Sequence, residues 1–558
     1  MTINPSTIGH DSYDLLDGSL SSFYQDVDEA IVASEVVKGQ YRLTVSPAYN
    51  SPNPVSINNF TTLALTQSGP MVVDLENSYI TATAKMKFRF NAGAEASTDS
   101  KSKAAFFLGW KSSIEAIERY DILVNSTPIY NQSFCGEESF LQYQTLNENV
   151  KHTSPYIYSS YEDVVKMSPN VCGTYVVMDF TTKMEPGTVV EAQIPIKIPI
   201  TNIMILKNLK YLLSWMGKWE LRVYFNYSNM VILPITSEVL GASLLGSDVY
   251  SGMLYKHMGD YQQFTQIGQT FFFPNGDEKD KATKNQTISV VEMAFNDVEM
   301  VSAQFQLRMD ICEMLKQKYL GGKPLTFPVS TFQIARFTAP VGAGSTIDPN
   351  EEGSLNCVLC QAINNCDTLF ILPFTTPYEK TICYNPHVRN FQLHAGEYGT
   401  YPTQPFDTWQ AGTKQETRHI RYLNLIADSL NVNSSNLTSF NNSVLGAHYY
   451  QLPVSGNSFN EQKDVDISYK GPNGENFDKS NFFFAIPFST DDDFQGGLSS
   501  PASNINFKVT GQIKNLTDAK LQFNTPWVAA FLIDGVIMIR PDPGSEAAKV
   551  IWSDRTVV

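Results

Sequence analysis

The chain has 558 residues, of which 42% are apolar, 12% aromatic and 17% charged. This length exceeds what one hydrophobic core usually serves, so we expect two domains of roughly 200–250 residues each. The formal net charge of −16 argues against a protein whose main task is to coat nucleic acid, because such proteins need clustered lysine and arginine. The many Tyr, Phe, Thr, Asn and Ser residues favour strands over helices.

Residues 1–60 are expected to form an N-terminal arm. They contain a polar lead, a predicted short helix around Phe23–Val37 and a Pro/Asn/Ser loop at Ser46–Asn59, and a segment without its own core is mobile or docks on a neighbour. A basic segment followed by an apolar core is not found near Met1, so no secretory signal is predicted. The apolar run Trp527–Ile533 is too short to span a bilayer. A soluble protein is expected.

The first convincing strand is Tyr79–Phe90, in which apolar and polar residues alternate, as expected when one face is buried. Ile117–Val124 is the next clear strand. It ends at Asn125-Ser126, and these two polar residues before a further apolar run predict a hairpin turn. Farther along, Ile311–Leu320 and Thr417–Leu430 are predicted helices. Asp534-Gly535 between two apolar runs predicts a hairpin near the end of the chain.

One pattern occurs twice. The first copy is QIPIKIPI (193–200), a loop, and the alternating run WELRVYFNY (219–227). The second is FAIPFS (484–489), an acidic and Gly/Ser-rich loop, and the alternating run NINFKVTGQI (504–513). A repeat separated by about half of the chain predicts two similar all-β units in tandem.

Many short strands joined by long excursions fit jelly-roll β-sandwiches better than immunoglobulin-type domains. The predicted fold is therefore all-β, with two tandem jelly rolls, long inserted loops and a few short helices. The predicted division is an arm at 1–60, a first jelly roll at 61–250 and a second jelly roll with long insertions at 251–558.

Two regions of the sequence are candidate chemical sites. Cys357, Cys360, Cys366 and Cys383 form the one cysteine cluster, and a C-x2-C pair can supply two zinc ligands. The second pair is missing and the surroundings are apolar, so buried thiols are the preferred interpretation and no metal site is predicted. Seven cysteines, an odd number, also do not fit a secreted disulfide framework, so folding in a reducing cytoplasm or nucleus is expected.

In the second region two histidines, His387 and His394, lie near two acidic residues, Glu397 and Asp407, in a stretch that also contains aromatic residues. A hydrolase site can be imagined there, but a polar loop that packs on a partner is preferred. Asp491-Asp492-Asp493 lacks the spaced oxygen ligands of a calcium loop, so a solvated loop tip is expected. No nucleophile elbow, H-E-x-x-H pair or P-loop occurs in the sequence. We therefore predict no catalytic residues, no cofactor and no enzyme.

The chain resembles the double-jelly-roll major capsid proteins of double-stranded DNA viruses, in particular the virophage and Polinton (Maverick)-like branch. The resemblance lies in IERYDILVNSTPIY (117–130), in QIPIKIPI followed by WELRVYFNY, and in FAIPFSTDDDFQGGLSSPASNINFKVTGQI (484–513). As an architecture it covers most of the chain after about residue 60, whereas no resemblance is identified for the N-terminal arm and residues 375–470.

The resemblance implies a structural protein of the virion. Its homotrimer would present six jelly rolls as a hexon-like, pseudo-hexagonal capsomer of an icosahedral shell. Its partners would be further copies of itself, a penton protein and minor capsid proteins, without sequence-specific nucleic-acid binding; contact with an inner membrane stays open. The alternative is a two-sandwich glycan-binding or carbohydrate-active protein with a site around His394, Glu397, Tyr398 and Trp409. A spike or fibre protein is a weaker option, because no repeated shaft is evident.

Overall fold

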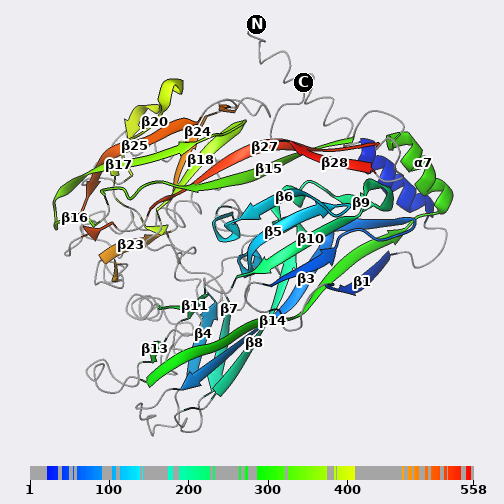
Figure 1. Cartoon of the computed structure of the whole chain (residues 1–558), viewed down its shortest axis with the longest axis horizontal. Helices are drawn as coiled ribbons and strands as arrows, with labels where there is room; N and C mark the ends of the chain where they lie inside the picture. Colours follow the sequence, from blue (N-terminus) through cyan, green and yellow to red (C-terminus); the bar gives the residue numbers. More distant parts are fainter. Residues whose placement is uncertain are drawn as a thin grey trace, which may run out of the picture.

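The structure is a computed structural model. It describes residues 22–34, 41–49, 55, 59–90, 103–108, 113–138, 141, 174–179, 187, 189–226, 230–232, 263–265, 270–273, 286–320, 325–342, 344–373, 383–384, 386, 388–408, 468–470, 476–480, 483–488, 497–500, 504–515, 521–523, 526–541 and 548–553. The described part of the chain consists mainly of antiparallel strands (Figure 1), as predicted. In it, no helix has the length and apolar character needed to cross a bilayer.

The first sandwich contains two sheets. One has the spatial order β1 (Tyr41–Pro47), β14 (Gln286–Gln306), β3 (Met71–Phe90) and β8 (Val189–Pro199). The other has the order β2 (Phe60–Ala64), β10 (Trp219–Phe225), β5 (Ile117–Val124) and β6 (Thr127–Ser133). If these eight strands are counted along the chain, the sheets have the orders 1-8-3-6 and 2-7-4-5.

The second sandwich repeats this arrangement. One sheet has the order β15 (Leu325–Arg336), β27 (Val528–Pro541), β18 (Cys366–Leu372) and β24 (Phe484–Pro487). The other has the order β17 (Glu352–Gln361), β25 (Ile505–Lys514), β20 (Val388–Ala395) and β21 (Thr400–Phe406). Counted along the chain, these strands again give 1-8-3-6 and 2-7-4-5. Two four-stranded antiparallel sheets connected in this order form a jelly roll, so the fold is a double jelly roll.

The predicted repeat corresponds to this duplication. QIPIKIPI overlaps β8 over residues 193–199 and FAIPFS overlaps β24 over residues 484–487, and each strand is the sixth of its sandwich. The alternating runs form β10 and β25, the seventh strands, whose burial patterns alternate as predicted. The two copies of the sequence pattern are thus equivalent strands.

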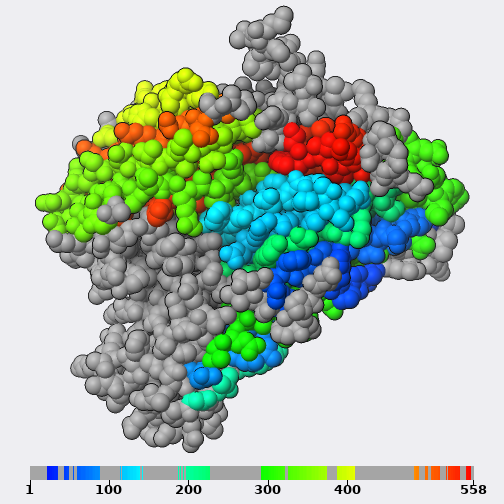
Figure 2. All heavy atoms as spheres, viewed as in Figure 1, coloured from blue at the N-terminus to red at the C-terminus, as the bar shows by residue number. Residues whose placement is uncertain are grey.

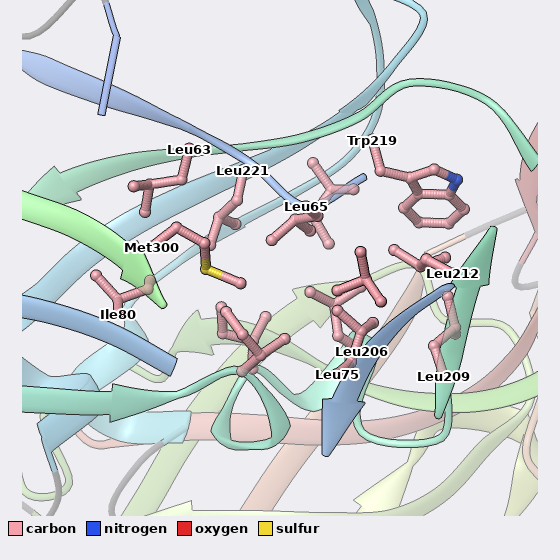
Figure 3. Close-up of a cluster of buried hydrophobic side chains, with 14 of the residues drawn as sticks. Leu63, Leu65, Leu75, Ile80, Leu206, Leu209, Leu212, Trp219, Leu221 and Met300 are labelled. Atoms are coloured by element: carbon pink, nitrogen blue, oxygen red, sulfur yellow. The ribbon is translucent and has the colours of Figure 1, made fainter. Parts of the chain in front are cut away.

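Each sandwich has its own core between its two sheets. In the first, Leu63 and Leu221 come from one sheet and Ile80 and Met300 from the other, and all four point into the same buried cluster (Figure 3). Phe225 stacks on Phe295 across the sandwich, with ring centroids 4.2 Å apart. In the second core, Phe391 of β20 stacks on Phe484 of β24 at 4.3 Å, and Phe507 and Phe531 lie 5.2 Å apart. Aromatic pairs of this kind join facing sheets.

The strands β15 and β27 belong to both cores. Phe332 and Phe531 are buried in the second core, whereas Phe327 and Ile537 of the same two strands are buried in the first. The pairing is uninterrupted from Leu325↔Ile539 to Arg336↔Val528. β28 (Ala548–Ser553) extends this sheet over the first sandwich, as seen along the top of Figure 1. We call Ser330, Thr331, Asp534 and Gly535, where the pair passes from one core to the other, the crossing point.

Two helical segments close one end of the first core. The helix over residues 22–34 buries Phe23 and Val27, and α7 (Met309–Leu320) buries Cys312 and Leu315. Phe23 contacts the rings of Trp215, Tyr319 and Phe327. Both segments agree with the helices predicted around Phe23–Val37 and Ile311–Leu320.

The remaining elements are short. Strands are β4 (Lys103–Leu108), β7 (Thr174–Asp179), β9 (Tyr211–Leu213), β11 (Met230–Ile232), β12 (Gln263–Thr265), β13 (Thr270–Phe273), β16 (Thr346–Ile347), β19 (Cys383–Tyr384), β22 (Ser468–Lys470), β23 (Asn476–Ser480) and β26 (Leu521–Gln522). The 3₁₀ turns are η1 (Ser113–Ala116), η2 (Ile200–Asn202), η3 (Met204–Leu206), η4 (Ser214–Met216) and η6 (Gly396–Tyr398). The hairpin predicted at Asn125-Ser126 joins β5 to β6, and both residues have the positive φ of a tight hairpin turn.

The hairpin predicted at Asp534-Gly535 is wrong, because both residues lie inside the continuous strand β27, opposite Ser330 and Val329. The predicted division at residue 250 also does not follow the strand pairing. β14, at 286–306, pairs with β3 and β1 and completes the first sandwich, and β1 itself lies within the predicted arm. We therefore propose that the units divide at residues 321–324, with residues 22–320 in the first.

Candidate functional site: an apolar end face and two rejected chemical sites

One end of the first sandwich exposes apolar side chains from three adjacent elements. They are Val32 of the helix over residues 22–34, Leu43 and Val45 of β1, and Met309 and Met314 of α7, each more than half exposed. We call these five residues the end face. Figure 2 shows this end of the molecule, with α7 in green and the β1 region in blue. Large exposed apolar residues that gather in one region mark surfaces for association.

Hydrogen bonds and ion pairs fix the elements that carry the end face. Lys318 and Tyr319 of α7 both donate to the Asp26 carboxylate, and Arg308 N donates to Ser34 Oγ at 3.2 Å. Burial raises the pKa of Asp26, but the bonds from Lys318 and Tyr319 outweigh it and lower the pKa below its ordinary value. Tyr211 of β9 donates to Asp28 at 2.5 Å. The helix over residues 22–34 is thereby attached on both sides.

β1 is also an edge strand, so its backbone N–H and C=O groups on one side can pair with another chain. Within the described residues it lies at the end of its sheet and pairs with β14 alone. Leu43 and Val45 project from the same face of this edge strand, since they are two residues apart. An edge strand with apolar side chains is a ready template for another chain, and monomeric proteins usually protect such edges.

The cysteine cluster does not form a chelating pair. Cys357 and Cys360 are three residues apart on β17, so they project from opposite faces of the sheet; Cys357 is buried and Cys360 exposed. Cys366 is buried in β18. Burial raises the pKa of both buried thiols well above the ordinary value, which disfavours the thiolate that a metal would need. Cys383 lies in β19, and its side chain is outside the described part of the structure.

Among the described residues around His394, the histidine ring is held by hydroxyl groups and not by a carboxylate. His394 Nδ1 lies 2.9 Å from Thr400 Oγ1, and Nε2 lies 3.0 Å from Thr510 Oγ1. Both ring nitrogens therefore contact hydroxyl groups on neighbouring strands. These two contacts fix the orientation of the ring within the sheet. Glu397 and Tyr398 are exposed in η6.

Asp407 has a structural partner. It is buried and accepts a hydrogen bond of 2.8 Å from the backbone N–H of Asn390, a residue with a positive φ at an irregularity of β20. His387, Trp409, Asp491–Asp493 and the helix predicted at Thr417–Leu430 lie outside the described residues. Among the described residues of the two regions, structural contacts are therefore observed for His394 and Asp407.

The end face was missed by the sequence reasoning. Its residues are far apart in the sequence, from Val32 to Met314. Each is an ordinary apolar residue in an amphipathic run. The alternation in YRLTVSP (41–47) is a local signal of a strand, but it does not tell which face is covered.

A scan against protein-family models finds no match, and a search of curated proteins finds none either. Solved structures do show similarity. The chain is similar to the Sputnik virophage structure from cryo-electron microscopy, at 12% identity and a TM-score of 0.48, over 93% of this chain and 89% of that chain. It is similar to the mavirus major capsid protein at 10% identity and a TM-score of 0.46, over 93% and 90% of the two chains. The Faustovirus major capsid protein gives 9% identity and a TM-score of 0.33, over 94% and 98%.

Proposed function

We propose that this chain is the major capsid protein of an icosahedral double-stranded DNA virus or virus-like element, and that three copies form a pseudo-hexagonal capsomer. The observation that supports this proposal is the duplication of one jelly roll, with the same strand order in both halves of a single chain. Three such chains around a threefold axis present six similar sandwiches, so a closed trimer approximates a hexagon. Hexagonal tiles can cover a closed shell when other proteins fill the vertices.

The strand edges and the loops supply the contacts of the capsomer. In this proposal the end face is one surface on which copies meet, because its apolar side chains lie beside an edge strand. Burial of such residues between copies removes apolar area from water, at roughly 25 cal/mol per Å². Partners other than the chain itself would be a penton protein and minor capsid proteins. The protein would act without catalysis and would be located in the capsid of the virion.

The glycan-binding alternative is not favoured by a specific observation. Its proposed site needs a concave arrangement of aromatic residues and carboxylates near His394. The hydroxyl groups of Thr400 and Thr510 contact both ring nitrogens of that histidine instead.

The native mass in solution tests the proposal. Three chains of 62.3 kDa give about 187 kDa, measured by light scattering after size exclusion. We expect a trimer, with hexagonal particles by negative-stain microscopy. A chain that stays monomeric over a wide range of concentration and salt, or one that binds a glycan on an array, would overturn the proposal.

Two matched variants locate the contact. Leu43→Lys places a charge on the end face, at a side chain that is 55% exposed, so it should leave the fold intact and reduce association. Val358→Lys makes the same change on β17 of the second sandwich, at 42% exposure. If both variants associate like the parent chain, the end face is not a contact between copies.

A further inference from the structure

The four sheets of the two jelly rolls have eight outer strands, and most of these strands are protected against pairing with another chain. Four of them contain an internal proline, which lacks the N–H group that pairing needs: Pro128 in β6, Pro195 in β8, Pro328 in β15 and Pro402 in β21. In addition, the Gln132 and Asn208 side-chain amides each donate to a carbonyl oxygen of β15 at 2.9 Å. β24 has only four residues, and a short edge strand offers little to a partner.

Two further outer edges are closed by neighbouring segments of the chain. In β2, Thr62 exchanges two backbone hydrogen bonds with Tyr49, at 3.0 and 3.2 Å. In β17, Val358 N donates to Thr338 Oγ1 at 3.0 Å, and the Val358 carbonyl oxygen accepts from Thr338 N at 3.2 Å. Of the eight outer strands, as the structure describes them, β1 alone has neither an internal proline, nor a short length, nor a segment bonded to its outer edge.

The alternation of hydrogen bonds determines which backbone groups of β1 point outward. β1 pairs antiparallel with β14, and Ala48, the next residue after β1, donates to the carbonyl oxygen of Val298 at 3.1 Å in the same register. In an antiparallel pair every second residue bonds to the same neighbouring strand, so Thr44 also bonds to β14. The N–H and C=O groups of Leu43 and Val45 therefore point away from the sheet and are available to a further strand.

We propose that β1 pairs antiparallel with β1 of a second copy across a twofold axis centred on Thr44, and that this pairing joins neighbouring capsomers. In this register Leu43 of one copy lies opposite Val45 of the other, so the outward groups of both copies exchange four hydrogen bonds. A threefold axis cannot pair a strand with itself, so the contact lies between capsomers and not within one. The inference rests on the proposed function, because it concerns contacts between trimers.

The charges around β1 suit a second copy of the same chain. The net charge of −16 makes copies repel one another unless the surface on which they meet is locally neutral. Arg42 is the one charged residue of β1, and in the proposed register it lies opposite Ser46 and not opposite a second arginine. The charged residues of α7 all have partners of opposite sign within the chain: Asp310 with Arg308, Glu313 with Lys316, and Lys318 with Asp26.

Apolar contacts add to the backbone pairing. Leu43 and Val45 are each more than half exposed in one copy, and as opposite residues of an antiparallel pair they contact each other twice across the axis. Met309 and Met314 of α7 belong to the same end face, and the flexible thioether side chain of methionine adapts to a facing surface. A strand of a second copy thus covers the edge and the apolar side chains together.

A cysteine at the proposed axis tests the register. Thr44 would lie opposite Thr44 of the second copy in a non-hydrogen-bonded pair, where the Cα atoms are about 4.5 Å apart and a disulfide can form. Thr44→Cys in the full chain, oxidised at a concentration at which trimers associate, should therefore give a covalent dimer on a non-reducing denaturing gel. Ser46→Cys is the matched control, because its partner in this register is Arg42. It should give no more dimer than the parent chain, which accounts for the exposed Cys360.

A second variant tests the hydrogen bonds themselves. Val45→Pro removes an outward N–H group from each copy and leaves the bonds of Thr44 to β14 in place. Light scattering should still give a trimer, but the association of trimers with one another should be weakened about tenfold or more, because two of the four hydrogen bonds are lost. Val45→Ala keeps the N–H group and should have a smaller effect. Near-ultraviolet circular dichroism establishes that both variants are folded.

The outcomes separate this inference from the proposed function. If the parent chain is a trimer but Thr44→Cys gives no more dimer than Ser46→Cys, the β1 pairing is overturned and the proposed function stands. Unchanged association of trimers in folded Val45→Pro, or loss of the trimer itself, would also overturn the pairing. If Val45→Pro does not fold, the two cysteine variants decide. A parent chain that stays monomeric would overturn the proposed function and this inference with it.

Discussion

At the scale of single residues, Gly535 shows how the chain permits a long strand to cross between two cores. A Cβ atom built on this glycine would lie 2.3 Å from Cη2 of Trp552 and 2.7 Å from the carbonyl oxygen of Ser553. The absence of a side chain thus leaves room for the Trp552 ring of the neighbouring strand β28 against Gly535. Trp552 in turn contacts the ring of Tyr130 in β6 at 5.6 Å, which connects the last strand to the first sandwich.

Gly535→Ala should therefore destabilise the protein. The added methyl group has to displace an indole ring and a backbone carbonyl, and overpacking of this kind costs about 1–3 kcal/mol in the free energy of unfolding. Gly344→Ala is a comparison for backbone strain alone, because its Cβ would meet no atom within 4 Å but the glycine has a positive φ. Urea unfolding measures both. A free energy of unfolding of Gly535→Ala equal to that of the parent chain would show that Trp552 moves aside without cost.

The same position shows a limit of local sequence patterns. Asp-Gly between two apolar runs is the usual signal of a hairpin, yet Asp534 accepts a hydrogen bond from Ser330 and Gly535 accommodates Trp552, both within a continuous strand. Pairing with β15, about 200 residues earlier in the chain, and packing against Trp552, which follows in the next strand, decide this conformation. By contrast, Asn125-Ser126 was predicted correctly, because both sides of that hairpin are adjacent in sequence.

At the scale of elements, the sequence was most informative where the fold repeats itself. The matching patterns at 193–227 and 484–513 identified the sixth and seventh strands of both sandwiches. The boundary between the units was not predictable in this way, because β14 resembles any other amphipathic strand and its partner β3 lies about 200 residues away. The end face was likewise unpredictable, since it depends on which strand becomes the edge of a sheet.

The element that contains Glu138 leads to a prediction for stability. Burial raises the pKa of this carboxyl from 4.5 to about 7, so ionising it in the folded state costs about 3 kcal/mol. Because the folded pKa is raised, this cost is absent at pH 4, grows as the pH rises and is complete above pH 7. Glu138→Gln should thus raise the free energy of unfolding by up to about 3 kcal/mol at pH 8 and change it little at pH 4.

Urea unfolding at the two pH values measures this effect. Glu397→Gln, at an exposed position, is the control and should show no comparable gain at pH 8. A Glu138→Gln variant with the same stability relative to the parent chain at both pH values would contradict the expected ionisation.

At the scale of the whole molecule, the two jelly rolls are not independent domains. Seven buried residues of the first core come from β15, β27 and β28: Leu325, Phe327, Val329, Ile537, Ile539, Ala548 and Val550. A fragment that comprises residues 1–320 lacks all of them. It should therefore expose part of its core and unfold at a lower urea concentration than the full chain, because loss of buried apolar area lowers stability.

The fragment is compared with the full chain by urea unfolding and by near-ultraviolet circular dichroism. A fragment with the same midpoint and the same aromatic signal as the intact protein would show that the first sandwich is complete without its C-terminal strands. The domain division at 321–324 would then describe two autonomous folding units.

The sharing of β27 between both cores also has a consequence for biosynthesis. A ribosome releases the chain from the N-terminus, so β15 emerges about 200 residues before β27, its partner. Until β27 and β28 have been synthesised, the first core lacks the residues that these two strands contribute. Nascent or prematurely terminated chains would retain exposed apolar surface for chaperones and proteases to recognise. A chain that stops before β27 therefore cannot complete the first core, because Ile537, Ile539, Ala548 and Val550 are missing from it.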